Sequence, residues 1–238
     1  MTLADWLAKH PFLQPVAELH ESIGAALASI SLPTVAVPDW TAYAEEYYAG
    51  IPLLMSQTAV IEFAPVESGL QSLLAELSRT PLANRSGDPG WLRLLRAMIV
   101  ARYLAPVVNA FGVWRDEERW LRNECPTCGA PPAMAQLIGK DPGRLRFLSC
   151  GHCRTRWRYR RTGCPFCDSG DDRPLRVLDI EGEGGLRIDH CDVCRGYVKT
   201  YNGTGSEAVL LADWTSLHLD LLARDRGLER RAVSLYEL

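Results

Sequence analysis

Every cysteine of this chain belongs to a C-x-x-C pair, and the four pairs, CPTC, CGHC, CPFC and CDVC, lie between positions 125 and 194. Two cysteines three positions apart in a tight turn, a knuckle, present both thiolates to one tetrahedral metal ion. Spacers of 21 and 23 residues suit hairpins that join the first knuckle to the second and the third to the fourth. We therefore predict two metal sites. Their ligands are Cys125, Cys128, Cys150 and Cys153 in site 1, and Cys164, Cys167, Cys191 and Cys194 in site 2.

An internal repeat favours this pairing. The segments around ECPTCGAPP and FLSCGHC recur around GCPFCDSGD and RIDHCDVC, at offsets of 39 and 41 residues. Two tandem ribbons explain the repeat more simply than an interleaved arrangement, in which knuckle one joins three and two joins four. A disulfide framework needs an oxidising compartment, and a thioredoxin-like redox centre needs only one such pair. His152 and His190 are expected to be knuckle-loop residues, because each site already has four sulfurs.

The ligand set leaves the metal open between zinc and iron, because four thiolates in a tetrahedron suit both ions. It argues against catalysis, since a catalytic zinc keeps one position open for water whereas a Cys₄ site is closed. The sequence also has no Gly-rich phosphate loop and no G-x-S-x-G or H-E-x-x-H motif. We expect a protein that is not an enzyme and that works through binding, electron transfer or metal-dependent shape.

The chain before the first cysteine has a mainly helical pattern. Apolar residues recur at helical spacing in residues 15–30 and 65–80. Asp39 is placed to cap a further helix that Gly50 would end. Residues 50–63 fit either a helix or a short buried strand, so the pattern leaves that segment ambiguous.

The most apolar segment begins at Asp88, an expected cap, and Pro89, at the first helical position. It predicts a buried central helix that Pro106 kinks or divides. The chain has no run of about 18 apolar residues, so membrane insertion is not expected. Because the N-terminus has Asp5 where a secretory signal would be basic, we expect a cytoplasmic protein.

In the cysteine-rich half, RLRFLSC and CRTRWRYRRTGC alternate with period two, as strands do. This alternation puts Thr155, Trp157 and Tyr159 on one face of a strand and arginines on the other. LRVLDIEGEGGLRIDHC predicts a second hairpin that turns at residues 182–185.

A last helix is predicted in ADWTSLHLDLLARDRG, with Asp213 as its cap, Gly227 at its end and Leu211 among its apolar residues. We expect it to pack on the ribbons or on the helical domain. The predicted fold is therefore α+β, with an all-helical N-terminal domain and two tandem rubredoxin-like (zinc-ribbon) metal domains. The domains are a helical domain over 1–122, the first ribbon over 123–162, and the second ribbon with the C-terminal helix over 163–238.

Charge is unevenly distributed. The formal net charge is -3, yet residues 144–161 hold seven arginines and no acidic residue. This segment is either a solvated strand face or a surface for an acidic or phosphate-bearing partner. Nucleic acid is not expected as the partner, because the chain is acidic overall and its aromatic and basic residues alternate onto opposite faces. The candidate partner surface is Arg154, Arg156, Arg158 and Arg160.

Several motifs resemble the FdhE family of formate dehydrogenase accessory proteins. They are CPTCGAPP, LSCGHCRTRWRYRRTGCPFC, CDVCRGYVKTY and LADWTSLHLDLLA, preceded by HPFL and GIPLL. The resemblance implies a helical domain followed by two rubredoxin-like ribbons that bind iron or zinc through the eight cysteines. It also implies a maturation role, in which the protein binds the catalytic subunit of formate dehydrogenase in the cytoplasm. Thr155, Trp157, Arg161, Tyr197 and Lys199 match motif positions of the family.

Two other functions stay open on the sequence. A rubredoxin-like electron carrier would use two irons that cycle between redox states. A nucleic-acid-binding zinc ribbon would use the arginines together with Trp157 and Tyr159.

Overall fold

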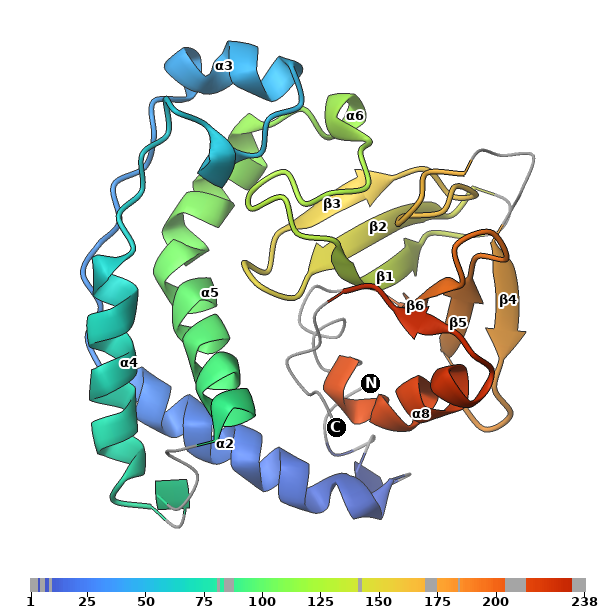
Figure 1. Ribbon diagram of the computed structural model, residues 1–238, viewed down its shortest axis with the longest axis horizontal. Helices are drawn as coiled ribbons and strands as arrows, with labels where there is room; N and C mark the ends of the chain where they lie inside the picture. The colour runs from blue at the N-terminus through green and yellow to red at the C-terminus, as the bar shows by residue number, and fades with distance from the viewer. Residues whose placement is uncertain are drawn as a thin grey trace.

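The computed structural model describes residues 4, 7–8, 10–80, 82–83, 88–140, 143–169, 175–183, 185–203 and 213–232. Helices make up the first half and a sheet the second, as Figure 1 shows. The helices are α2 (Gln14–Ser29), α3 (Trp40–Tyr48), α4 (Ala64–Leu77), α5 (Pro89–Trp114), α6 (Glu117–Trp120) and α8 (Leu217–Asp225), with 3-10 turns η1 (Pro11–Leu13) and η2 (Leu53–Met55). The strands are β1 (Pro132–Ile138), β2 (Leu145–Cys150), β3 (Arg156–Tyr159), β4 (Arg176–Asp179), β5 (Leu186–His190), β6 (Gly196–Asn202) and β7 (Glu229–Arg230).

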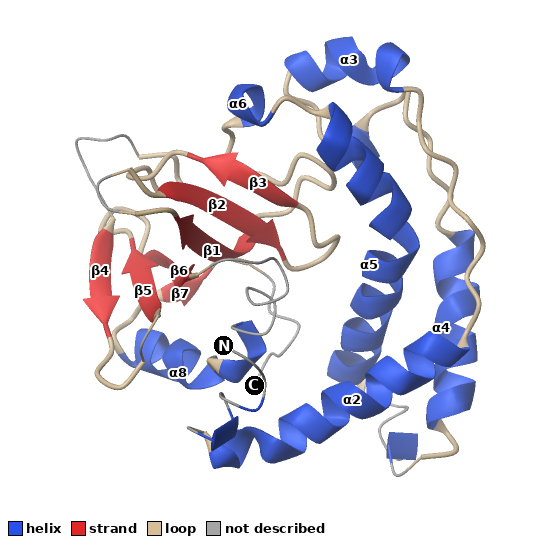
Figure 2. Ribbon diagram, turned by 180° about the vertical axis from the view of Figure 1, so that it is seen from behind, coloured by secondary structure: helices blue, strands red, loops and turns tan. Residues whose placement is uncertain are grey.

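The strands form one sheet, in the order β3-β2-β1-β6-β5-β4, with β7 beside β6 (Figure 2). Within each ribbon the strands are antiparallel, as expected for hairpins. The two ribbons meet where β1 pairs in parallel with β6, with Met134 opposite Lys199. The predicted α+β fold, with a helical region before two cysteine ribbons and a helix at the end, is confirmed.

Helix α5 begins as predicted, because the Asp88 carboxylate accepts a hydrogen bond from the Gly90 N–H at 2.8 Å. The helix continues past Pro106 to Trp114, so the predicted division at this proline is wrong. An interior proline costs about 3 kcal/mol, and burial of Leu104 and Val107 on either side opposes that cost. Among the described helices, α5 alone is long and apolar enough to cross a membrane, but its buried residues form the core of the protein.

Segment 50–63 forms neither the helix nor the strand considered from its sequence. Beyond the short turn η2 it is irregular. The reason lies in its hydrogen bonds: the Leu53 and Leu54 N–H groups donate to the Pro126 and Thr127 carbonyls of the first knuckle, at 2.9 and 2.7 Å. Long-range partners thus replace the local bonds that a helix would need.

One hydrophobic core spans the helical half and the first ribbon. Leu95 and Phe111 of α5 belong to the same buried cluster as Leu148 of β2 and Trp157 of β3. A second, smaller cluster lies under α8, where Leu219 packs with residues of the sheet. The core therefore crosses the predicted boundary between residues 122 and 123, and the three domains remain a prediction.

The C-terminal helix packs on the sheet, but it does not begin as predicted. Residues 213–215 are helical, Ser216 interrupts them, and α8 starts at Leu217. Asp213 is not a cap, because its buried carboxylate pairs with Lys199 at 3.1 Å and with Arg230 at 2.7 Å. The helix ends before Gly227, whose φ of +67° suits glycine. Leu211 lies outside the described residues.

Candidate metal centres

Each knuckle is a tight turn with the same backbone geometry. The residue directly after the second cysteine has a left-handed conformation in every case. Glycine adopts this conformation without strain, whereas other residues rarely adopt it. The left-handed residues are Gly129 (φ +74°), Arg154 (φ +65°), Asp168 (φ +53°) and Arg195 (φ +59°).

The turns bring the sulfurs together in the tandem arrangement. In site 1, Cys125 Sγ lies 3.5 Å from Cys153 Sγ, and Cys128 Sγ lies 3.5 Å from Cys150 Sγ. All four sulfurs of site 1 lie within 4.8 Å of one another. A tetrahedral ion with metal–sulfur bonds of about 2.3 Å needs sulfurs about 3.8 Å apart. The donor set and its spacing therefore fit one tetrahedral ion.

Site 2 has the same form with slightly wider spacing. Cys164 Sγ lies 3.7 Å from Cys194 Sγ, and Cys167 Sγ lies 3.8 Å from Cys191 Sγ. These four sulfurs also lie within 4.8 Å of one another. All eight cysteines are free thiols, so the disulfide alternative finds no support.

Site 1 lies inside the core. Cys125, Cys150 and Cys153 are buried, and Cys128 is half-buried. Burial raises the pKa of the Cys125 thiol, since the thiolate is the form that desolvation disfavours.

Two hydroxyl groups support site 1. The Thr127 and Thr155 hydroxyls are 2.6 Å apart, and Thr155 Oγ1 lies 3.1 Å from Cys153 Sγ. The sequence placed Thr155 on the strand face of Trp157 and in the family motif, but it gave no role to Thr155 and no signal for Thr127.

Site 2 has a more polar environment. Cys167 is exposed and Cys194 half-buried, while Ser169 Oγ lies 3.4 Å from Cys167 Sγ and 3.6 Å from Cys191 Sγ. Desolvation would raise the pKa of Cys191, but hydrogen bonds from the Cys194 backbone and the Ser169 side chain lower it to about 6. Nothing in the spacing of the cysteines indicated this difference between the sites.

The arginine strand β3 alternates as predicted. Trp157 and Tyr159 are buried, so neither is available to stack on a base, while the arginines of the other face are half-buried. Three of the four candidate arginines already have partners within the chain. These are Gln136 for Arg156 at 3.2 Å, Glu118 for Arg158, and Asp168 for Arg160.

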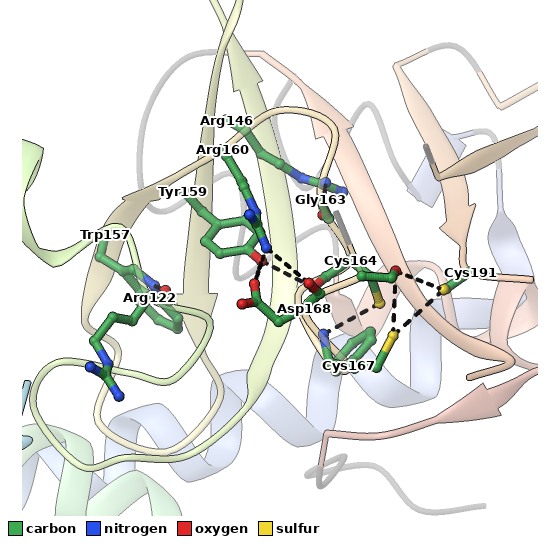
Figure 3. A network of polar contacts seen from close by, with 12 residues as sticks. Arg122, Arg146, Trp157, Tyr159, Arg160, Gly163, Cys164, Cys167, Asp168 and Cys191 are labelled. Carbon is green, nitrogen blue, oxygen red and sulfur yellow. Dashed lines mark hydrogen bonds and ion pairs between the residues drawn. The ribbon is translucent and has the colours of Figure 1, made fainter. Parts of the chain in front are cut away.

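Side chains of the first ribbon make hydrogen bonds to a knuckle of the second ribbon, as Figure 3 shows. The Tyr159 hydroxyl contacts the Cys164 carbonyl and the Asp168 carboxylate, each at 3.0 Å. Deeper in the sheet, Arg146 donates to Asp189 at 2.9 Å, and both side chains are buried. Sequence reasoning missed Asp168 and Asp189, because each finds its partner in the other ribbon.

A helical half joined to one sheet with two Cys₄ clusters defines a double-ribbon protein suited to binding two metal ions. Residues 124–161, which carry most of the first ribbon, match the family described as FdhE, central domain. This match covers part of the chain, and the two FdhE homologues described next are also similar to it.

Two relatives each match about half of the chain. An FdhE homologue of Aquifex aeolicus is 32% identical over 56% of this chain and 49% of its own length. A homologue of Pseudomonas aeruginosa is 38% identical over 48% of this chain and 39% of its own length. The chain therefore matches about half or less of the length of each of these two curated relatives. The crystal structure of the FdhE protein from Pseudomonas aeruginosa shares the fold, with a TM-score of 0.61 and 24% identity over 94% of this chain and 88% of that one.

Proposed function

We propose that the chain is a cytoplasmic accessory protein for formate dehydrogenase, which binds the catalytic subunit and supports formation of active enzyme. It is not itself an enzyme. Similarity to FdhE homologues and to the FdhE central domain supports formate dehydrogenase as the client, together with the motif resemblance. The single observation that carries the proposal is the pair of closed Cys₄ clusters on one sheet, a frame for binding rather than a reactive centre.

The eight cysteines hold two ions, zinc or iron, in this proposal. The ions stabilise the knuckles, because metal binding to thiolates contributes directly to the folding free energy of small sites. The chain's own residues then fix the shape: Tyr159 and Arg146 join the two ribbons, so both sites present one rigid surface to a client.

The arginine face of β3 forms part of the client surface in this proposal. Three of its arginines pair with groups of the chain, so an acidic client segment would share or replace those partners. Charge reversal of Arg154, the remaining member of the row, should weaken client binding at least tenfold and reduce its salt dependence. Reversal of Arg79, which follows α4 and forms an exposed ion pair with Glu76, is the matched control.

The test is deletion of the gene in its host followed by assay of formate oxidation. We expect activity to be lost and to return with the wild-type gene. Copurification of the tagged protein with the catalytic subunit should show the contact directly. Normal formate oxidation in the deletion strain would overturn the proposal.

An electron carrier is the second candidate, favoured by the exposed edge of site 2 at Cys167. Metal analysis and visible absorption of anaerobically purified protein separate the two functions. Two tightly bound zinc ions would exclude electron transfer, because Zn²⁺ has no accessible redox change.

A further inference from the structure

The two clusters occupy different environments although their sequences repeat. Cys128 and Cys167 are equivalent, since each is the second cysteine of the opening knuckle of its ribbon. Cys128 is half-buried, whereas Cys167 is exposed. The closing knuckles differ in the same direction, because Cys153 is buried and Cys194 half-buried. Cys164 and Cys191 are buried like their counterparts Cys125 and Cys150, so the difference lies at the second cysteine of each knuckle.

The helical half covers site 1. The backbone N–H groups of Leu53 and Leu54 bond the knuckle carbonyls of Pro126 and Thr127. Met55 lies against the same turn, where a Cβ added at Gly129 would meet its sulfur at 2.8 Å. Segment 53–55 therefore covers one side of this knuckle.

A cavity lies beside site 2. Its volume is about 260 Å³, several times the share of about 30 Å³ that one water molecule takes in the liquid. It lies between the opening knuckles of the two ribbons, and two cysteines of site 2, Cys167 and Cys194, form part of its wall. Its lining includes Glu124, Pro131, Phe166, Cys167, Cys194 and Arg231.

The polar groups of this cavity leave Cys167 approachable. Arg231 donates to the Cys194 carbonyl at 2.7 Å, so its guanidinium is held at the closing knuckle. The sulfur of Cys167 contacts the small hydroxyl of Ser169 at 3.4 Å. Phe166 and Pro131 supply apolar surface, which a small molecule with a short carbon chain can contact. The cavity thus suits a low-molecular-weight thiol.

We infer that site 2 is a ligand-exchange site, in which a low-molecular-weight thiol enters the cavity and replaces Cys167, while site 1 is a closed structural site. The inference rests on the metal occupancy proposed above and is independent of the client. The exchange is balanced: the incoming thiol gives up its proton and binds as thiolate, and the Cys167 sulfur leaves and takes a proton. No electron is transferred. The consequence is that one ion of the pair can be removed or supplied without unfolding the other ribbon.

The test uses full-length protein loaded with two equivalents of Zn²⁺, excess 4-(2-pyridylazo)resorcinol as chelator, and increasing glutathione. We expect one equivalent to leave at least tenfold faster than the other, with only the fast rate rising with glutathione. Cys167→Ser should accelerate the fast phase at least tenfold and leave the slow phase unchanged. The matched variant Cys128→Ser should change only the slow phase.

Two measurements keep the inference testable if those variants fold poorly. Alkylation of the wild-type zinc protein with iodoacetamide, read by mass spectrometry, should modify Cys167 before any other cysteine. Asn123→Trp, which keeps all eight cysteines and fills the cavity, should slow the glutathione-dependent phase several-fold. Equal release rates, a glutathione-independent fast phase or first alkylation at Cys128 would overturn the inference. None of these results depends on formate dehydrogenase, so the proposed client can fail separately.

Discussion

Two left-handed glycines, one in a knuckle and one in a hairpin turn, have the same backbone conformation in different environments. Gly129 has such a conformation beside Met55, whereas Gly182, in the turn between β4 and β5, has one in open space. The first glycine is therefore needed for its φ and for its lack of a side chain, and the second for its φ alone.

Comparing alanine at these two glycines separates the two requirements. Gly182→Ala should cost about 1 kcal/mol, the strain of a left-handed non-glycine residue. Gly129→Ala should cost up to about 1 kcal/mol more, because the new Cβ must also displace the exposed, flexible Met55 side chain. Urea unfolding of the zinc-loaded proteins measures both values. Equal costs would show that the contact with Met55 is unimportant.

His20 makes stability depend on pH. Its ring stacks on Trp214, with centroids 4.6 Å apart, and burial and Arg154 lower its pKa from 6.5 to about 4. Between these values the unfolded state binds a proton that the folded state does not, so this contribution is complete above pH 6.5 and is lost as the pH falls towards 4. The loss is at most ~3 kcal/mol.

Replacing His20 with phenylalanine keeps a ring against Trp214 and removes the titration. The free energy of unfolding of the variant should therefore fall less than that of the wild type between pH 7 and pH 5. The difference between the two proteins isolates the histidine, because protonation of cysteine ligands weakens metal binding in both. Parallel pH profiles would contradict the assignment.

At the scale of elements, buried charges join the ribbons. Arg146 of β2 reaches Asp189 of β5, two strands that β1 and β6 separate in the sheet. Asp189 also pairs with Arg187 at 2.9 Å and accepts from the Thr200 hydroxyl at 2.8 Å. Burying such a network costs desolvation free energy. Removing one of its partners strongly destabilises the folded state, because the remaining charge stays buried without its partner.

Arg146→Met should lower the free energy of unfolding by roughly 3–5 kcal/mol, because it leaves the Asp189 carboxylate buried without its closest cross-ribbon partner. Arg79→Met is the control, since its ion pair with Glu76 is exposed and worth less than about 1 kcal/mol. Chemical unfolding followed by tryptophan fluorescence measures both changes. A loss in Arg146→Met no larger than in the control would contradict the role of the pair.

Elements whose signals are local could be predicted from the sequence. The caps Asp39 and Asp88 accept hydrogen bonds from their helices, and the alternation around Trp157 matches strand β3. Elements fixed by distant partners could not. Segment 50–63 takes its backbone bonds from a knuckle more than 70 positions away, and Asp213 pairs with Lys199 instead of capping.

The candidate sites follow the same division. The repeat predicted which cysteines meet, because the spacing within each ribbon is local to it. The unequal burial of Cys128 and Cys167 depends on which ribbon the helical half covers, and no pattern within either ribbon encodes that choice. For the same reason the parallel pairing of β1 with β6 could not be foreseen.

At the scale of the molecule, the shared core ties the helical half to the first ribbon. Trp157 and Leu148 complete a cluster that α5 begins. A fragment of residues 1–122 should therefore expose apolar surface, bind 8-anilinonaphthalene-1-sulfonate and unfold without a cooperative transition. A fragment of residues 1–162 with one equivalent of zinc should melt cooperatively. Cooperative melting of the shorter fragment would show instead that the helices fold alone.

The two ribbons are joined head to tail at the centre of the sheet. By the repeat, β4 corresponds to β1 and β6 to β3, so the central pairing of β1 with β6 joins unlike edges. Among the described strands, β3 and β4 end the sheet, and they are the same two kinds of edge. A head-to-tail joint of this type can repeat from one molecule to the next, in a ring where the rotation closes and in a filament where it does not. Helix α6 lies against β3, where Glu118 pairs with Arg158, so a second molecule that paired at this edge would meet α6 beside it.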